Sequence, residues 1–265
     1  MKTALTIAGS DSGGCAGIQA DLRTFAAHRV HGTSVVTALT AQNTVGVRTA
    51  QPVGADFVRA QLDAVLDDFE IAAVKTGMLA DPDILKTVGW AARSGRLPNL
   101  VVDPVMIATS GDTLFEGDAA EYLRSLGDSA VLLTPNLSEA DTLGGVIIHD
   151  EDDMRTAARL IAASTSAAVL VTGGHLNRDS SLDLLCIDGE CFEFESERVD
   201  TDNTHGTGCT LSAAITANLA LGHDLLEAVA AAKQYVTGAL TAGADLRLGQ
   251  GSGPVDHMWW FDGEK

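Results

Sequence analysis

The chain lacks the features expected of a membrane or nucleic-acid partner. No apolar run approaches the roughly 20 residues that a bilayer-spanning helix needs. Basic residues are scarce: 17 Lys and Arg stand against 36 Asp and Glu, which gives a formal net charge of −19 at pH 7. Nucleic acids and anionic membranes bind positive surfaces, so we expect neither as a partner. The apolar segment at residues 4–8 is too short for a signal peptide, which predicts a cytoplasmic location.

The acidic balance has two explanations, and the sequence leaves both open. The first is an ordinary soluble protein with an acidic surface. The second is adaptation to high salt, because an acidic surface repels itself unless salt screens the charges. Lysine is especially rare, at positions 2, 75, 86, 233 and 265. Activity and stability measured across potassium chloride concentrations distinguish the two.

The cysteines form no metal-binding pattern. Cys15, Cys186, Cys191 and Cys209 contain no CxxC pair and no zinc spacing. Cys186 and Cys191 flank an Asp-Gly turn at residues 188–189, so they can face each other across a hairpin. Because disulfides are rare in the cytosol, we expect two buried thiols there rather than a bond.

The Gly-rich turn at residues 9–17 lacks two common nucleotide-binding signatures. It contains no GxGxxG fingerprint and no Walker A lysine. A dinucleotide-dependent dehydrogenase and a P-loop enzyme are therefore disfavoured.

Apolar runs alternate with amphipathic stretches along most of the chain. Strands are expected at residues 4–8, 34–40, 72–76, 100–102, 130–134 and 168–171. Helices are expected at residues 18–28, 55–68, 82–94, 118–126, 138–143, 152–163, 207–221 and 224–242. This alternation predicts an α/β fold with a mainly parallel sheet and helices on both faces. Residues 182–187 and 190–195 are expected to form an antiparallel hairpin at the sheet edge, within a single domain spanning residues 1–265.

Polar or Gly-rich segments follow five of the expected strands. They are residues 9–17, 42–44, 75–79, 103–106 and 134–139. The carboxyl ends of parallel strands share one edge of a sheet, and ligands bind there in open α/β folds. The five segments together predict one ligand-binding cleft.

The segment at residues 203–212 leads into a helix of small and apolar residues. Gly206 and Gly208 allow close approach of a ligand to the backbone. The free N–H groups and the dipole of the helix start then form a cradle for an anion such as a phosphoryl group. A simple turn capped by Thr207 explains the composition equally well.

This segment, Asn-Thr-His-Gly-Thr-Gly-Cys-Thr-Leu-Ser, resembles the anion hole of ribokinase-like kinases. The form with cysteine is similar to the hydroxymethylpyrimidine and phosphomethylpyrimidine kinases. Matching segments occur in order at residues 7–21, 38–44, 75–79, 103–106 and 134–140. The resemblance implies a three-layer αβα sandwich and phosphorylation of 4-amino-5-hydroxymethyl-2-methylpyrimidine and its monophosphate in thiamine biosynthesis. It further implies ATP and Mg²⁺ as cofactors, with K⁺ as an additional candidate, and a homodimer.

The resemblance assigns the reaction centre to the start of the Ala-rich helix. Cys209 would accept the proton of the substrate hydroxyl, at a position where most ribokinase-like kinases have Asp. A thiol at a helix N-terminus has a lowered pKa, which suits this role. The N–H groups of Gly206, Thr207 and Gly208 would stabilise charge in the transition state.

Four residues would contact the pyrimidine: Asp21, Gln42, Met78 and Val105. The amide of Gln42 offers a donor and an acceptor to an aminopyrimidine edge. The thioether of Met78 suits an aromatic face. Without the other motifs, Gln42 is better explained as a surface residue and Met78 as a core residue.

Asp103, Asn136 and Glu139 would manage Mg²⁺, which prefers carboxylate and amide oxygens and keeps several waters. Asn136 and Glu139 form the Asn-x-x-Glu motif of the family. The same pair is also a plausible N-cap and capping partner, and the two roles can coexist. Thr172, Gly174 and His205 are the expected nucleotide-binding residues.

Two departures from the family pattern bear on the substrate. Residues 171–175 resemble a segment in which the family has lysine at the position of Thr172, so one phosphate-neutralising charge is missing. Some related pyridoxal kinases carry Thr there, which keeps pyridoxal kinase as an alternative. A pyrimidine-binding protein without catalysis is a second alternative. The other departure is Cys15, where the family has glycine.

Overall fold

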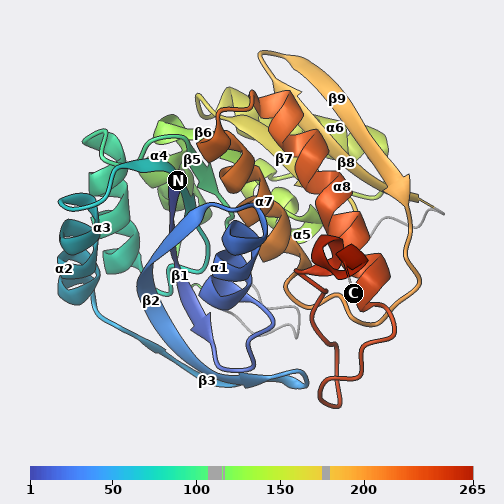
Figure 1. Cartoon of the computed structure of the whole chain (residues 1–265). Coiled ribbons are helices and arrows are strands. Elements are labelled where there is room, and N and C mark those ends of the chain that lie inside the picture. The colour runs from blue at the N-terminus through green and yellow to red at the C-terminus, as the bar shows by residue number, and fades with distance from the viewer. Residues whose placement is uncertain (107–114, 116, 175–179, 265) are drawn as a thin grey trace.

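The structure is a computed structural model and describes residues 1–106, 115, 117–174 and 180–264. Within these residues, nine strands form one sheet in the order β3-β2-β1-β4-β5-β6-β7-β8-β9 (Figure 1). The strands are β1 (Thr3–Asp11), β2 (His31–Asn43), β3 (Gly46–Pro52), β4 (Ile71–Thr76), β5 (Leu100–Val102), β6 (Ala130–Leu133), β7 (Ala168–Thr172), β8 (Ser180–Ile187) and β9 (Glu190–Glu197). The α-helices are α1 (Gly17–Ala27), α2 (Ala55–Leu66), α3 (Pro82–Arg93), α4 (Ala119–Leu126), α5 (Leu137–Gly144), α6 (Glu151–Ala163), α7 (Thr207–Leu221) and α8 (Leu225–Gly243). The 3₁₀ turns η1 (Gly127–Ser129) and η2 (Trp259–Glu264) complete the set.

The centre of the sheet is parallel and its edges are antiparallel. Strands β2, β1, β4, β5, β6 and β7 pair in parallel, whereas β3 pairs with β2, and β8 with β7 and β9, in antiparallel fashion. The predicted α/β class, the parallel sheet and the edge hairpin are therefore confirmed. Strand β3 was not predicted, because most of its side chains are exposed and it carries no buried periodic pattern.

Helices cover both faces of the sheet and divide the core into layers. Helices α2 to α6 bury a cluster that includes Ile7, Val74 and Val102 from the central strands. On the opposite face, α7 and α8 pack on a second cluster that includes Val101 and Leu132. Neighbouring residues in β5 thus point to opposite layers, as the alternation of a strand requires.

The C-terminal segment lies over the loop that precedes α7. The His205 N–H donates to the carbonyl of Gly253 at 3.1 Å, and the Gly253 N–H donates to Asn203 Oδ1 at 3.0 Å. The Gln250 N–H donates to Thr44 Oγ1 at 3.1 Å, which links the same segment to the turn between β2 and β3. The tail therefore fixes one wall of the cleft described below.

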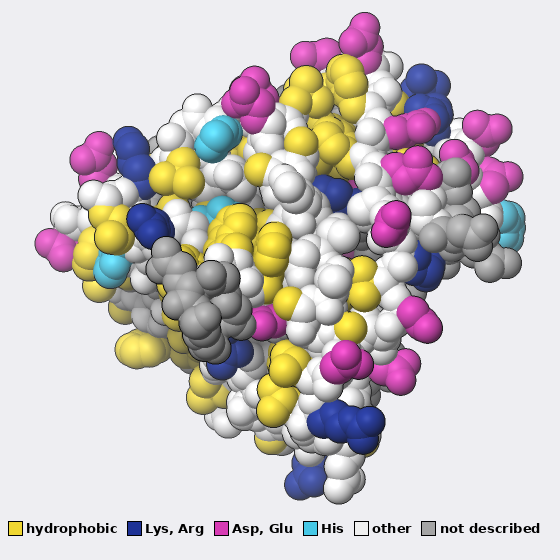
Figure 2. Space-filling model, turned by 45° about the vertical axis from the view of Figure 1, so that its right-hand side comes forward, with side chains coloured by type: hydrophobic (Ala, Val, Ile, Leu, Met, Phe, Trp, Pro, Cys, Tyr) yellow, Lys and Arg dark blue, Asp and Glu magenta, His cyan; other side chains and the backbone are white. Residues whose placement is uncertain are grey.

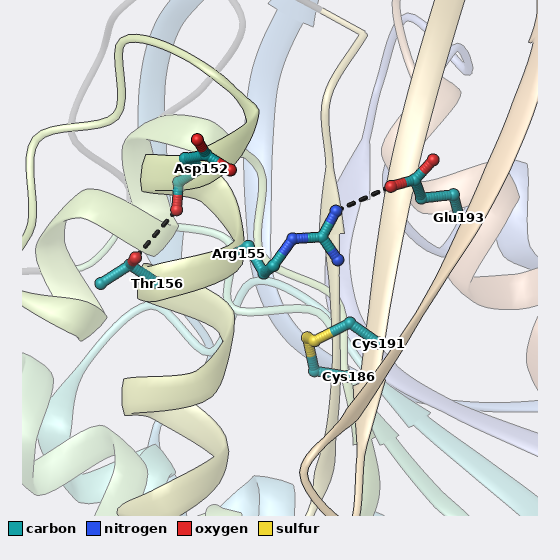
Figure 3. The surroundings of a disulfide bond; sticks show 6 residues. All are labelled: Asp152, Arg155, Thr156, Cys186, Cys191 and Glu193. Carbon is teal, nitrogen blue, oxygen red and sulfur yellow. Dashed lines mark hydrogen bonds and ion pairs between the residues drawn. A yellow bond between two sulfur atoms is a disulfide. The ribbon is translucent and has the colours of Figure 1, made fainter.

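The β8–β9 hairpin corrects the expectation of two free thiols. Cys186 and Cys191 are directly opposed in the ladder, their Cα atoms are 4.1 Å apart, and their sulfurs are bonded (Figure 3). The predicted Asp-Gly turn is present, with positive φ at both Asp188 and Gly189. Figure 3 also shows Arg155 of α6 reaching over this bond to Glu193 of β9, at 2.7 Å. The two cysteines are directly opposed across a tight hairpin, which places their sulfurs within bonding distance. The expectation of free thiols rested on the reducing cytosol and did not take this geometry into account.

The surface agrees with the acidic composition. Figure 2 shows Asp and Glu side chains spread over one face, interspersed with hydrophobic patches and fewer basic groups. Among the described residues, no helix combines the length and the apolar character needed to cross a membrane.

Candidate active site

A cleft of about 460 Å³ opens along the carboxyl ends of the parallel strands. The five segments expected at this edge all contribute to its wall, together with the start of α7 and part of α8. The predicted site residues that line the cleft are Gln42, Met78, Asp103, Val105, Asn136, Glu139, Thr172, Gly174, His205, Gly206, Thr207, Gly208 and Cys209. The fold thus brings together residues more than 160 positions apart, such as Gln42 and His205.

Asp21 does not line the cleft. Its side chain is fully buried, accepts a hydrogen bond from Thr6 Oγ1 at 2.6 Å and is paired with Lys75 Nζ at 2.7 Å. This placement favours a role in holding Lys75 over the expected direct contact with the pyrimidine. In the sequence, Lys75 stands out only as part of the motif at residues 75–79.

Lys75 supplies a buried positive charge close to Cys209. Its Nζ also lies 3.7 Å from Asp103 Oδ2. Burial alone would lower the pKa of Lys75, but Asp21, Cys209 and Asp103 raise it above its usual value, so the side chain stays an ammonium. Ser212 Oγ donates to the same Asp103 oxygen at 2.9 Å. The carboxylate of Asp103 is thereby fixed at the edge of the cleft.

The pKa of Cys209 departs from the expected direction. Burial raises the pKa of its thiol to about 12, and the charges of Asp103 and Asp21 act in the same sense. The ammonium of Lys75 and a hydrogen bond from the Gly17 N–H act to lower it. In this structure Cys209 is therefore a thiol, with a cation and an N–H donor already beside the sulfur.

The start of α7 is an open turn with no side-chain cap. Gly206 has φ of 83°, and a Cβ there would collide with the carbonyl of Cys15, so glycine is required. A Cβ on Gly208 would meet only open space. Among the described residues, the amides of Gly206 and Gly208 have no hydrogen-bond acceptor, whereas the Thr207 N–H donates to the Thr204 carbonyl at 3.2 Å. The cradle therefore consists of Gly206 and Gly208 more than of Thr207.

Asn136 and Glu139 form a complete capping box at the start of α5. The Glu139 N–H donates to Asn136 Oδ1 at 2.9 Å, and the Asn136 N–H donates to Glu139 Oε2 at 3.0 Å. Burial and the nearby Asp103 raise the pKa of Glu139 to about 8. Burial also raises the pKa of Asp103. Two crowded carboxyl groups at the cleft wall are a setting that a cation stabilises.

This donor set fits Mg²⁺, which binds proteins through one or two carboxylates and retains water. Asp103 and Glu139 would supply carboxylate oxygens, with Asn136 beside them. Among the described residues, no group of three or more His, Cys, Asp or Glu side chains is arranged to hold a metal ion.

Met78 and Val105 line the part of the cleft where the sequence predicts contact with an aromatic ring. Met78 is buried, and its sulfur lies 3.1 Å from the position that a Cβ on Gly9 would take. Glycine at position 9 therefore leaves the thioether room beside β1. Val105 is half-buried in the same wall.

Lys233 of α8 is a cleft residue that sequence reasoning missed. Its Nζ donates to Asp183 Oδ2 at 2.8 Å and to Ser181 Oγ at 3.0 Å. In the ladder, Asp183 pairs with Thr172, where the family pattern has lysine. Lys233 thus places an ammonium near the position that lost one. A single lysine within an Ala-rich helix gave no local signal of this role.

Cys15, the second departure, causes no backbone strain. It lies outside the positive-φ residues, is buried, and its N–H donates to Asp11 Oδ2 at 2.9 Å. His175, the last residue of the segment that contains Thr172, lies outside the described residues.

Comparison with known proteins agrees with this geometry. The sequence model of the family described as "Phosphomethylpyrimidine kinase" matches residues 11–256. A hydroxymethylpyrimidine/phosphomethylpyrimidine kinase of Rhizobium meliloti is 48% identical over 264 residues, with 98% of both chains covered. The thiamine biosynthesis bifunctional protein ThiED of Geobacter sulfurreducens is 46% identical, over 96% of this chain and 52% of its own length. The solved ADP complex of Bacillus subtilis pyridoxal kinase superposes with a TM-score of 0.90 at 39% identity, covering 98% of this chain and 99% of the kinase.

Proposed function

Because the chain belongs to the phosphomethylpyrimidine kinase family, we propose that it transfers the γ-phosphoryl group of ATP to 4-amino-5-hydroxymethyl-2-methylpyrimidine and then to its monophosphate. These steps supply the pyrimidine for thiamine biosynthesis. One observation carries the proposal: the glycine turn of α7, the sulfur of Cys209 and the amide of Gln42 face a single cleft.

The pyrimidine binds at the β1, β2 and β4 end of the cleft. Gln42 bonds the amino edge of the ring, and Met78 and Val105 contact its faces. The hydroxymethyl group then points toward Cys209, whose pKa the Gly17 N–H acts to lower. Approach of the hydroxyl is favoured because alignment of the two reactants removes an entropic cost from the reaction.

The phosphates lie against the start of α7. The amides of Gly206 and Gly208 point toward an anion in the cleft, and the helix dipole adds to the attraction. Lys233 neutralises phosphate charge in place of the lysine absent at Thr172, while Gly174 leaves the backbone accessible. Mg²⁺, held through Asp103, Glu139 and Asn136, would offset the negative charge of the phosphates.

The thiolate of Cys209 receives the proton of the substrate hydroxyl as the new O–P bond to the γ-phosphorus forms, while the bond from that phosphorus to the β-phosphate oxygen breaks and ADP leaves. Before that step the thiol of Cys209 releases its own proton to solvent in the open cleft, and the buried ammonium of Lys75 favours the resulting thiolate. Lys75 stays protonated because Asp21 and Asp103 lie beside it.

Pyridoxal phosphorylation is the second candidate function. The superposition on the Bacillus subtilis pyridoxal kinase and the Thr at position 172 favour it. A pyrimidine-binding protein without turnover is the third candidate.

Mass spectrometry of products separates the three candidates. The full chain is incubated with ATP and Mg²⁺ and with either the hydroxymethylpyrimidine or pyridoxal. We expect the pyrimidine monophosphate and then the diphosphate. Phosphorylation of pyridoxal alone would replace the proposal with the second candidate, and tight pyrimidine binding in titration without any product would replace it with the third.

Two further features are part of the proposal. We expect a homodimer, which analytical ultracentrifugation measures directly. We also expect the enzyme in the cytoplasm, where ATP is available, which fractionation of the source cells would test.

A further inference from the structure

Five polar groups form a chain along one side of the cleft. Thr40 Oγ1 lies 3.0 Å from the carbonyl of Ser10 and 3.0 Å from Gln42 Oε1. Gln42 Nε2 lies 3.0 Å from His205 Nε2, which is 3.5 Å from Asp11 Oδ2. The chain thus runs from the Ser10 carbonyl through Thr40, Gln42 and His205 to the Asp11 carboxylate.

The number of protons available in this series of hydrogen bonds constrains the orientation of the Gln42 amide. The Thr40 hydroxyl has one proton, but two carbonyl-type oxygens face it. At the other end, a Gln42 N–H can donate to His205 Nε2 only if that nitrogen carries no proton. The unprotonated nitrogen would then also face the negatively charged carboxylate of Asp11, which is unfavourable. Both conflicts disappear when the amide is turned by 180°, which exchanges an oxygen and a nitrogen of nearly equal size. Thr40 then donates to Ser10 and accepts from Gln42, and Gln42 accepts from His205.

Asp11 places a carboxylate beside His205 Nε2. Its carboxylate accepts the N–H groups of Gly13 at 2.7 Å and of Cys15 and Ala16 at 2.9 Å each. Burial opposes ionisation of Asp11, but the bonds to His205 and to these amides prevail and lower its pKa. A carboxylate that stays ionised beside Nε2 favours the N–H form of that nitrogen.

We propose that His205 is a positioning residue for substrate specificity: its Nε2–H, directed by Asp11, donates to Gln42 Oε1 and fixes which way the Gln42 amide faces. With Thr40 and His205 bonded, Gln42 keeps one N–H and one carbonyl lone pair for the ligand. An amide with this pair free binds a heterocycle that carries an amino group next to a ring nitrogen, as Asn and Gln do with adenine. The inference rests on the proposed contact between Gln42 and the aminopyrimidine.

The tautomer of His205 is directly measurable. Two-bond ¹H–¹⁵N correlation spectra of the full chain with labelled histidine identify the protonated ring nitrogen, and the His205 signals are those lost in His205→Gln. We expect the Nε2–H tautomer at neutral pH. An Nδ1–H tautomer would overturn the inference.

Ligand titration tests the effect on specificity. Dissociation constants are measured for the hydroxymethylpyrimidine and for its analogue without the 4-amino group. His205→Leu should weaken binding of the aminopyrimidine about tenfold, the loss of one hydrogen bond, and leave the analogue within twofold. His205→Gln carries an N–H donor at a similar reach and should restore most of the preference.

Equal losses for both ligands, or identical behaviour of the Leu and Gln variants, would show that His205 acts only through packing and would refute the inference. If the wild-type chain phosphorylates the pyrimidine while His205→Leu keeps full preference, only this inference fails. If the wild-type chain does not phosphorylate the pyrimidine at all, the proposed function fails as well.

Discussion

Cys209 is the proposed catalytic base. It sits at the first turn of α7 with Lys75 and the Gly17 N–H beside its sulfur. Cys209→Ala should lower kcat by about 10² to 10⁴, the usual contribution of a general base, with a KM within a few-fold of wild type. Steady-state kinetics measure both. Cys15→Ala, at the other free cysteine, is the control and should keep its turnover. An unchanged kcat in Cys209→Ala would refute the role of base.

Substitution of Lys233 tests whether a lysine on α8 replaces the positive charge that is absent at Thr172 of β7. Lys233→Met should raise the KM for ATP about tenfold, because a buried charge contact to phosphate is worth at least one factor of ten. Thr172→Lys in the same variant should recover part of that loss, since position 172 pairs with Asp183, the partner of Lys233. Lys86→Met, at an exposed site on α3, is the control. An ATP KM that stays at the wild-type value would show that Lys233 serves only Asp183.

At the scale of elements, the disulfide bond of the β8–β9 hairpin can be tested by counting free thiols. The chain has four cysteines, of which Cys15 and Cys209 are free. Alkylation of the protein, unfolded without reductant, should therefore add two groups, and four after reduction. Intact-mass spectrometry reads the number. Four additions without reductant would show that Cys186 and Cys191 are free thiols, as the sequence predicted.

The same bond contributes to stability only modestly. It joins cysteines five positions apart, and short loops restrict the unfolded chain little. Removal in a Cys186→Ala, Cys191→Ala double variant should cost about 2 kcal/mol or less of unfolding free energy. Urea denaturation measures it, and wild-type protein in reductant should match the double variant.

The C-terminal segment makes the contact with α7 sensitive to pH. His257 is buried, and its Nε2 lies 3.0 Å from Thr210 Oγ1, whose proton is donated to the Gly206 carbonyl. Burial, with a smaller effect of Arg23, lowers the pKa of His257 from 6.5 to about 4. The unfolded chain thus binds the proton more readily between these values, and stability falls as the pH drops from 6.5 toward 4.

The expected loss from His257 is on the order of 3 kcal/mol over that window. His257→Gln keeps a donor for Thr210 but does not titrate, so its melting temperature should fall less steeply between pH 6.5 and 4.5. Thermal unfolding by circular dichroism measures the slope. His149→Gln, at the surface, is the control. Parallel slopes in wild type and His257→Gln would contradict the assignment.

For the whole molecule, charge dominates the response to salt. A net charge of −19 repels itself through solvent, and the screening distance shortens from about 30 Å at 0.01 M salt to about 3 Å at 1 M. The urea midpoint should rise over this range, equally in KCl and NaCl. A flat response would favour the ordinary acidic protein over the salt-adapted one. A rise confined to KCl would indicate a bound K⁺ instead.

The sequence alone determined the architecture because its signals are local. Apolar periodicity, Gly-Thr-Gly-Cys at 206–209 and Asn-x-x-Glu at 136–139 depend on neighbours within one turn or one strand. Helix α7 and the Asp-Gly turn of the hairpin follow the expected positions for this reason. Strand β3 was not predicted because its mostly exposed side chains show no hydrophobic periodicity.

Only the tertiary structure decided what buried or remote groups do. Asp21 faces Lys75 below the cleft, Cys209 gains a raised pKa from burial, and Lys233 reaches the neighbourhood of Thr172 through Asp183. Each result depends on distances and desolvation between segments far apart in the chain. Distances and desolvation between remote segments cannot be read from spacing along the sequence, so they became known only from the fold.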